Sequence, residues 1–92
     1  MKKKNLVFIV TYKSSEKIYN IINKIKKIRE FKKYDIYISD DNSPDNTIYY
    51  LKKIKNKKII ISYNKKNLGY GGNIKKCMKY AFKNNYDKAV MI

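Results

Sequence analysis

Cysteine and arginine are scarce in this chain, and each shortage excludes a class of protein. Cys77 is the only cysteine, so no intrachain disulfide can form and a reducing cytosol is the expected environment. Arginine occurs once, at Arg29. Proteins that read nucleic-acid sequence use arginine for bidentate contacts to bases, so the composition argues against a specific nucleic-acid reader.

Long hydrophobic runs are also absent. No apolar segment approaches the ~18 residues of a transmembrane helix. The run at residues 6–10 follows lysines but is too short for the core of a signal peptide. The sequence therefore predicts a cytoplasmic protein with no transmembrane segment in this chain. A position at the membrane surface stays open for the full-length protein.

Acidic residues are few, with 7 Asp and Glu against 23 Lys and Arg, and the net charge is +16. Such a charge indicates either an anionic partner, such as nucleic acid or a membrane, or a compositional bias toward Lys, Ile, Asn and Tyr. The lysines are spread along the whole chain, which favours the bias. Nucleic acid is therefore not expected as a partner. A noncatalytic basic module that binds nucleic acid or anionic surfaces is the alternative interpretation.

Hydrophobic periodicity predicts alternating strands and helices. Residues 5–11 form a continuous apolar run, typical of a central strand covered on both faces, and further strands are predicted at 35–39, 58–62 and 88–92. Helical crossovers between them imply parallel strands with right-handed connections. The predicted fold class is α/β, a doubly wound, mostly parallel sheet in the order β-α-β-α-β-α-β. Residues 1–92 are predicted to be a single partial domain that ends inside the fourth strand.

Each predicted helix carries one apolar stripe. The first helix extends to about Phe31. In the second, Ser43 is the predicted N-cap and Pro44 the first helical residue. In the third, Cys77 is predicted to be a buried structural thiol. The stripes consist of Ile18, Ile21, Ile22, Ile25 and Ile28 in the first helix, Ile48, Leu51 and Ile54 in the second, and Ile74, Cys77, Met78, Ala81 and Phe82 in the third.

Two adjacent carboxylates, Asp40 and Asp41, follow the second predicted strand. Like charges so close repel each other, so the pair is costly unless a polar, cationic or N–H-rich partner lies above it. Ligands of open α/β sheets bind at this end of the strands. Helix capping and loop ordering are the alternative roles for the pair.

Two further features are predicted at the same edge of the sheet. Tyr12 follows the first strand, where its ring could stack on a base or could merely cover the sheet. The segment at 67–73, NLGYGGN, holds all three glycines. These would either let backbone N–H groups approach a diphosphate at the N-terminus of the third helix or form a flexible loop.

Other phosphate-binding folds fit the pattern less well than a mononucleotide site. A Rossmann dinucleotide site needs its glycines after the first strand, and the first loop has none. No P-loop motif occurs. A phosphoacceptor receiver domain would place its paired acids after the first strand and another aspartate after the third.

Residues 40–47, DDNSPDNT, resemble the D-D-x-S-x-D-x-T segment of family-2 glycosyltransferases. Residues 10–12, VTY, resemble the end of their first strand, usually P-x-Y-N, although Val10 replaces the proline and Lys13 the asparagine. The segment at 67–73 resembles their N-x-G loop, closest to the dolichol- and polyprenyl-phosphate sugar synthase branch. The resemblance implies a GT-A (Rossmann-like) fold, of which this chain is the nucleotide-sugar-binding part.

The resemblance also implies a UDP- or GDP-linked sugar donor, a lipid-phosphate or glycan acceptor, and a set of nucleotide-binding residues. That set is Thr11 and Tyr12 in the base pocket, Asp41 as the main base contact, Asp40 beside it near the ribose, Gly69 and Gly71 bordering the diphosphate, and Lys75 as a phosphate contact.

No catalytic residue and no metal ligand is implied within this chain. The divalent-metal motif of the family, which binds Mg²⁺ or Mn²⁺, lies at the end of the fourth strand, about where Ile92 stands. A metal is therefore expected only for the full-length enzyme, and sugar transfer by this chain alone is not expected. A pseudoenzyme remnant with a structural role is a third interpretation.

Overall fold

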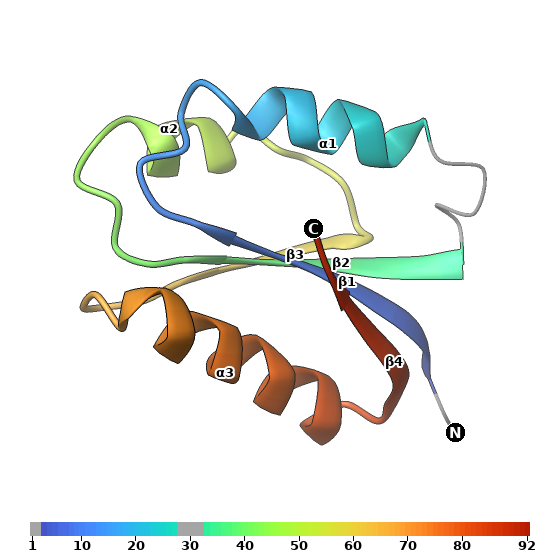
Figure 1. The fold of residues 1–92 in the computed structure, drawn as a ribbon. Helices are drawn as coiled ribbons and strands as arrows, with labels where there is room; N and C mark the ends of the chain where they lie inside the picture. The colour runs from blue at the N-terminus through green and yellow to red at the C-terminus, as the bar shows by residue number, and fades with distance from the viewer. Residues whose placement is uncertain (1–2, 28–32) are drawn as a thin grey trace.

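The computed structural model describes residues 3–27 and 33–92, which form a layered arrangement of a sheet and helices (Figure 1). The predicted part of the first helix around Ile28 and Phe31 lies outside the described residues, as does Arg29. The elements follow in the order β1 (Lys3–Thr11), α1 (Ile18–Lys26), β2 (Tyr34–Asp40), α2 (Thr47–Leu51), β3 (Ile59–Tyr63), α3 (Gly69–Lys83) and β4 (Tyr86–Met91).

The sheet is parallel throughout, and its strand order is β3-β2-β1-β4. Helices α1 and α2 cover one face and α3 covers the other (Figure 1). The predicted α/β fold class with a doubly wound parallel sheet is confirmed. Helix α3 carries the chain from β3 at one edge to β4 at the other, so the strand order reverses beside β1. Open α/β sheets bind their ligands at such a reversal, outside the carboxyl ends of the strands.

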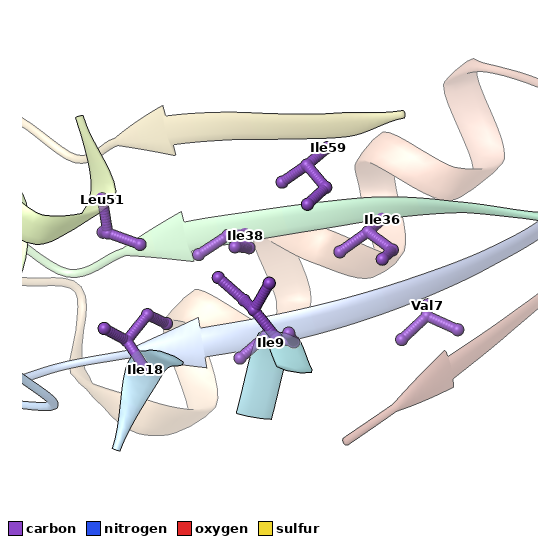
Figure 2. Close-up of a cluster of buried hydrophobic side chains, with 8 residues drawn as sticks. Val7, Ile9, Ile18, Ile36, Ile38, Leu51 and Ile59 are labelled. Carbon is purple, nitrogen blue, oxygen red and sulfur yellow. The ribbon is translucent and has the colours of Figure 1, made fainter. Parts of the chain in front are cut away.

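The hydrophobic core is divided between the two faces of the sheet. On the side of α1 and α2 it consists of Val7, Ile9, Ile18, Ile22, Ile36, Ile38, Leu51 and Ile59 (Figure 2). On the side of α3 it consists of Leu6, Phe8, Tyr37, Cys77 and Ala81. Successive residues of β1 thus point to opposite faces, and both faces are covered, which explains why its sequence is a continuous apolar run.

Cys77 is fully buried, as predicted. Burial raises the pKa of its thiol to about 11. Because the thiolate is the reactive form of cysteine, this side chain behaves as a packing group of the core.

Two side chains of the predicted third stripe are not in the core. Phe82 is 86% exposed and Met78 is 50% exposed, so their predicted burial is wrong. Cys77 and Ala81 point toward the sheet, and the residue that follows each of them is turned about 100° around the helix. Met78 and Phe82 therefore face away from the sheet.

The second helix begins later than predicted. Helix α2 starts at Thr47, and Asn46 at its N-cap makes no side-chain capping bond. Asp45 accepts hydrogen bonds from the Thr47 N–H at 3.0 Å and the Thr47 hydroxyl at 2.5 Å, and the hydroxyl bond lowers the pKa of Asp45. The predicted Ser43 cap and Pro44 start are wrong, because the Ser43 side chain is bound to Asp40 instead.

The third helix begins earlier than predicted. Residues 67–73 are predicted to be a loop, whereas α3 starts at Gly69 and includes all three glycines. At its other end, Asn84 is the C-cap and Asn85 has a φ of 59°, the left-handed conformation that commonly ends a helix. No helix among the described residues is long and apolar enough to cross a membrane.

Candidate functional site

A cavity of about 450 Å³ lies where the carboxyl ends of β1 and β2 meet the start of α3. Four of the predicted site residues, Thr11, Tyr12, Asp41 and Gly69, line it together. They come from three separate segments of the chain, brought to one edge because all strands run in the same direction. The full lining is Val10, Thr11, Tyr12, Ser14, Asp41, Asn67, Gly69, Tyr70 and Asn73.

Asp41 lies at the base of this cavity and is only 3% exposed. Its Oδ1 accepts hydrogen bonds from the Leu68 N–H at 2.7 Å and from Asn64 Nδ2 at 3.0 Å, and its Oδ2 accepts one from the Gly69 N–H at 2.9 Å. Leu68 and Gly69 are the N-cap and first residue of α3, so Asp41 caps this helix from a distant strand. Negative charge is also favoured there by the helix dipole.

Asp40 lies beneath the cavity and is fully buried. Its Oδ1 accepts hydrogen bonds from the hydroxyls of Thr11 and Ser43, each at 2.7 Å, and its Oδ2 accepts one from the Ser43 N–H at 2.9 Å. The two carboxylates therefore turn apart, Asp40 toward β1 and the following loop and Asp41 toward α3. Each carboxylate accepts hydrogen bonds from donors of its own, and these bonds offset the repulsion between the two neighbouring negative charges.

The loop after β1 presents Tyr12 to the cavity. The Lys13 N–H donates to Ser43 Oγ at 3.1 Å and the Ser14 N–H to Thr47 Oγ1 at 2.8 Å, which fastens the loop to Ser43 and to the first residue of α2. Lys13 has a φ of 52°, a conformation that asparagine adopts more readily than lysine. The Tyr12 side chain remains 46% exposed and lines the cavity, with the Lys13 ammonium 5.4 Å from the centroid of its ring.

Gly69 opens α3 with a φ of 81°. A side chain at this position would be strained by the backbone conformation. It would not clash with neighbouring atoms, because none lies within 4 Å of where a Cβ would be. The Asp41 cap compensates for the weak helix propensity of the glycines, and this is the physical reason that α3 starts earlier than the sequence indicates.

Behind Asp41 lies a polar network that the sequence analysis missed. Asn64 donates through Nδ2 to Asp41 Oδ1 and to Asn73 Oδ1, the latter at 3.1 Å. Asn73 in turn accepts a hydrogen bond from the Ser39 hydroxyl at 2.6 Å and donates to the Ser39 carbonyl at 2.9 Å. Among the described residues, every buried side-chain nitrogen and oxygen has a partner. Asn64 directly follows β3, and this position at a strand end is the one feature of the sequence that could have indicated a role in the site.

Lys76 closes this network from the outer side. Its ammonium donates to Ser62 Oγ at 2.7 Å and to Asn64 Oδ1, and burial lowers its pKa. An ammonium can only donate, so Asn64 must turn its oxygen toward Lys76 and its NH₂ group toward Asp41. Lys76 thereby fixes the orientation of the amide that supports Asp41.

We expect Lys76→Met to lower the free energy of unfolding by about 1.5 kcal/mol, because two hydrogen bonds from a charged donor are lost. Lys75→Met is the matched control, since it removes the same charge from an exposed neighbour that makes neither bond. Urea unfolding followed by circular dichroism measures both. Equal losses in the two variants would show that the network does not depend on Lys76.

Two predicted site residues lie elsewhere. Lys75 borders a different depression, beside α3 and next to Tyr80, and Gly71 does not line the cavity that holds Asp41. Helical geometry explains both placements, because a residue one or two positions from Asn73 points to another side of α3. Within residues 3–27 and 33–92, no three acidic, cysteine or histidine side chains come close enough together to hold a metal ion.

Comparison with known proteins identifies the family of this chain. The family model described as glycosyl transferase family 2 matches residues 6–86, a span that includes most of β1, both carboxylates and the whole of α3. No curated protein matches the chain. Since the family model covers most of its length, this chain belongs to glycosyltransferase family 2.

Proposed function

We propose that the cavity beside Asp41 binds the nucleotide of a nucleotide-diphosphate sugar, the donor substrate of glycosyl transfer. The observation that carries the proposal is the convergence of an exposed aromatic ring, a buried carboxylate and a glycine-led helix start on one cavity. Its volume of about 450 Å³ lies within the range of small-molecule sites. Membership of family 2 supports a nucleotide-sugar donor.

In the proposed complex the base stacks on Tyr12 and donates a hydrogen bond to Asp41. The diphosphate extends toward Tyr70 and the first turn of α3, where the helix dipole favours negative charge. Thr11 and Asp40 act beneath the ligand: Asp40 is fully buried, so it holds Thr11 in place and does not reach the ribose.

The bonds that Asp41 already makes limit which base it can bind. Oδ1 accepts two hydrogen bonds and Oδ2 accepts one, and a carboxylate oxygen accepts about two. One acceptor position is therefore left, on Oδ2. Uracil has a single ring N–H and needs one acceptor. Guanine has two neighbouring N–H donors and would need two free acceptors, one more than Asp41 has left. We infer that a uridine diphosphate sugar is the preferred donor.

The role proposed for the described residues is to bind the donor. A stacked base contributes roughly 1–3 kcal/mol and a charge-assisted hydrogen bond about 1.5–3 kcal/mol, which together correspond to an affinity near millimolar. Within the described part of the chain no group of acidic, cysteine or histidine side chains could hold a metal ion, so the proposed binding depends on stacking and hydrogen bonding. A lipid-phosphate acceptor, which the resemblance to the polyprenyl-phosphate branch suggests, and a glycan acceptor are both compatible with this donor site.

Tyr12→Ala tests the proposal without disturbing the core. We expect UDP to shift the NMR signals of residues around Asp41 in the native protein, with GDP binding more weakly. The variant should bind UDP at least about tenfold more weakly, since one stacking contact is lost, while its stability stays unchanged. Tyr49→Ala, at an exposed tyrosine on α2, is the matched control. If neither nucleotide shifts these signals at millimolar concentration, the proposed function is wrong.

A further inference from the structure

The side of α3 that faces away from the sheet combines positive charge with exposed apolar side chains. We call this surface the outer face of α3 and define it by Lys75, Met78, Lys79, Phe82 and Lys83. At about 100° per residue, these five positions occupy an arc of about 140° opposite the buried Cys77 and Ala81. Helix α3 lies alone on its side of the sheet (Figure 1), so nothing among the described elements covers this face.

The apolar part of the outer face is larger than a solvated helix requires. Phe82 is almost entirely exposed and Met78 is half exposed. Burying a Phe or Met side chain is favourable, and this face leaves that stabilisation unused in the structure. An exposed phenylalanine among lysines is typical of a helix that lies in a membrane interface.

The charged part of the outer face carries one sign only. Lys75, Lys79 and Lys83 follow one another at intervals of four residues, and with Lys76 they border a depression of about 500 Å³ beside the helix. The α3 sequence, GYGGNIKKCMKYAFK, contains no acidic residue. Each lysine near an anionic membrane surface adds to the attraction between protein and membrane. A row of three on one side of α3 therefore favours the orientation in which that side meets the membrane.

Two other occupants of this surface fit less well. The tyrosines beside the lysines are not free to stack on nucleic-acid bases, because Tyr37 is buried and its ring lies parallel to that of Tyr80 at a centroid distance of 3.9 Å. A second copy of the chain would bring two lysine rows and two net charges of +16 together. An anionic lipid surface satisfies both the lysines and the apolar side chains.

We propose that the outer face of α3 binds the surface of anionic membranes, with the helix axis parallel to the bilayer. Phe82 and Met78 enter the boundary between headgroups and acyl chains, and Lys75, Lys79 and Lys83 meet the lipid phosphates. This inference stands apart from nucleotide binding, because the outer face shares no residue with the cavity that contains Asp41.

A single tryptophan at position 82 provides a direct reporter, since the chain has no tryptophan and position 82 is exposed. We expect the emission of Phe82→Trp to shift to the blue with vesicles of phosphatidylcholine and phosphatidylglycerol, and to stay unchanged with phosphatidylcholine alone. In sedimentation with the mixed vesicles, Phe82→Ser should bind at least about fivefold more weakly than the native chain, because the inserted apolar group is lost.

Two triple variants separate the outer face from the bulk charge. Lys75→Gln, Lys79→Gln and Lys83→Gln together should weaken binding to the mixed vesicles at least about tenfold. Lys17→Gln, Lys24→Gln and Lys26→Gln, at exposed positions in and just before α1, lower the net charge equally and should change binding less than about twofold.

Three results would overturn the proposal. Equal weakening by the two triple variants would mean that bulk charge alone attracts the chain. Sedimentation of Phe82→Trp with vesicles without a shift in emission would mean that another face binds. A shift in emission produced by self-association or by an oligonucleotide, and not by the mixed vesicles, would assign the surface to a second copy or to nucleic acid.

Discussion

Replacing Asp41 by alanine is expected to lower the free energy of unfolding by roughly 3 kcal/mol, because one buried carboxylate accepts hydrogen bonds from Leu68, Gly69 and Asn64 and its loss leaves donors unpaired. For a domain of this size that is a large share of the total stability. Urea unfolding followed by circular dichroism, with the native chain in parallel, measures the loss.

Asp41→Asn is the informative companion to this variant. The asparagine keeps one oxygen for Leu68 and Asn64, but it places an NH₂ group where Oδ2 faces Gly69 and the proposed base. We expect about half of the alanine variant's stability loss and no detectable UDP binding in the folded protein. A fully folded Asp41→Asn variant that binds UDP as the native chain does would exclude Asp41 as the base contact. The basic-module interpretation expects that result.

The second large effect is expected at Asp40. Asp40→Ala removes the acceptor for the hydroxyls of Thr11 and Ser43 and for the Ser43 N–H, all in a site closed to water. We expect a loss of about 3 kcal/mol in the free energy of unfolding. The loop that carries Tyr12 should also lose order, since its Lys13 N–H is bound to Ser43. Hydrogen exchange of the Lys13 and Ser14 amides measures that loosening directly.

Asparagine at position 40 distinguishes hydrogen bonding from charge. A hydroxyl can accept as well as donate, so Thr11 can reverse its bond and accept from the new NH₂ group. Asp40→Asn should therefore lose only about 1 kcal/mol, one hydrogen bond's worth. A loss as large as that of alanine would mean that the negative charge itself, and not the number of acceptors, holds the loop.

The fold was predictable from sequence because its signals are local and repeated. Each strand is an apolar run and each helix has a periodic stripe, and these patterns together define the parallel topology. How far the buried side of α3 extends around the helix was not predictable. Met78 and Phe82 continue the apolar pattern of Cys77 and Ala81, and only the position of the helix over the sheet decides that they face outward.

The site was predictable in its location and not in its bonding. Strand ends bring Tyr12, Asp41 and Gly69 to one edge, and that follows from topology alone. The capping of α3 by Asp41 joins residues far apart in sequence, so no local sequence pattern predicts it. The same holds for Asn64 and Lys76, which act through a network whose members come from β2, β3, α3 and the loops that follow the two strands.

The pairing of β1 with β4 has a consequence for how this chain folds. Leu6 pairs with Ala89, 83 positions further along the chain, so β1 gains its second neighbour only after the residues of β4 have been synthesised. Contacts between such distant residues form slowly, and until then one side of β1 remains an unpaired edge that can recruit other strands. Completion of β1 on the ribosome therefore waits for β4 to emerge, and this part of the nascent chain is most prone to aggregate just before it does.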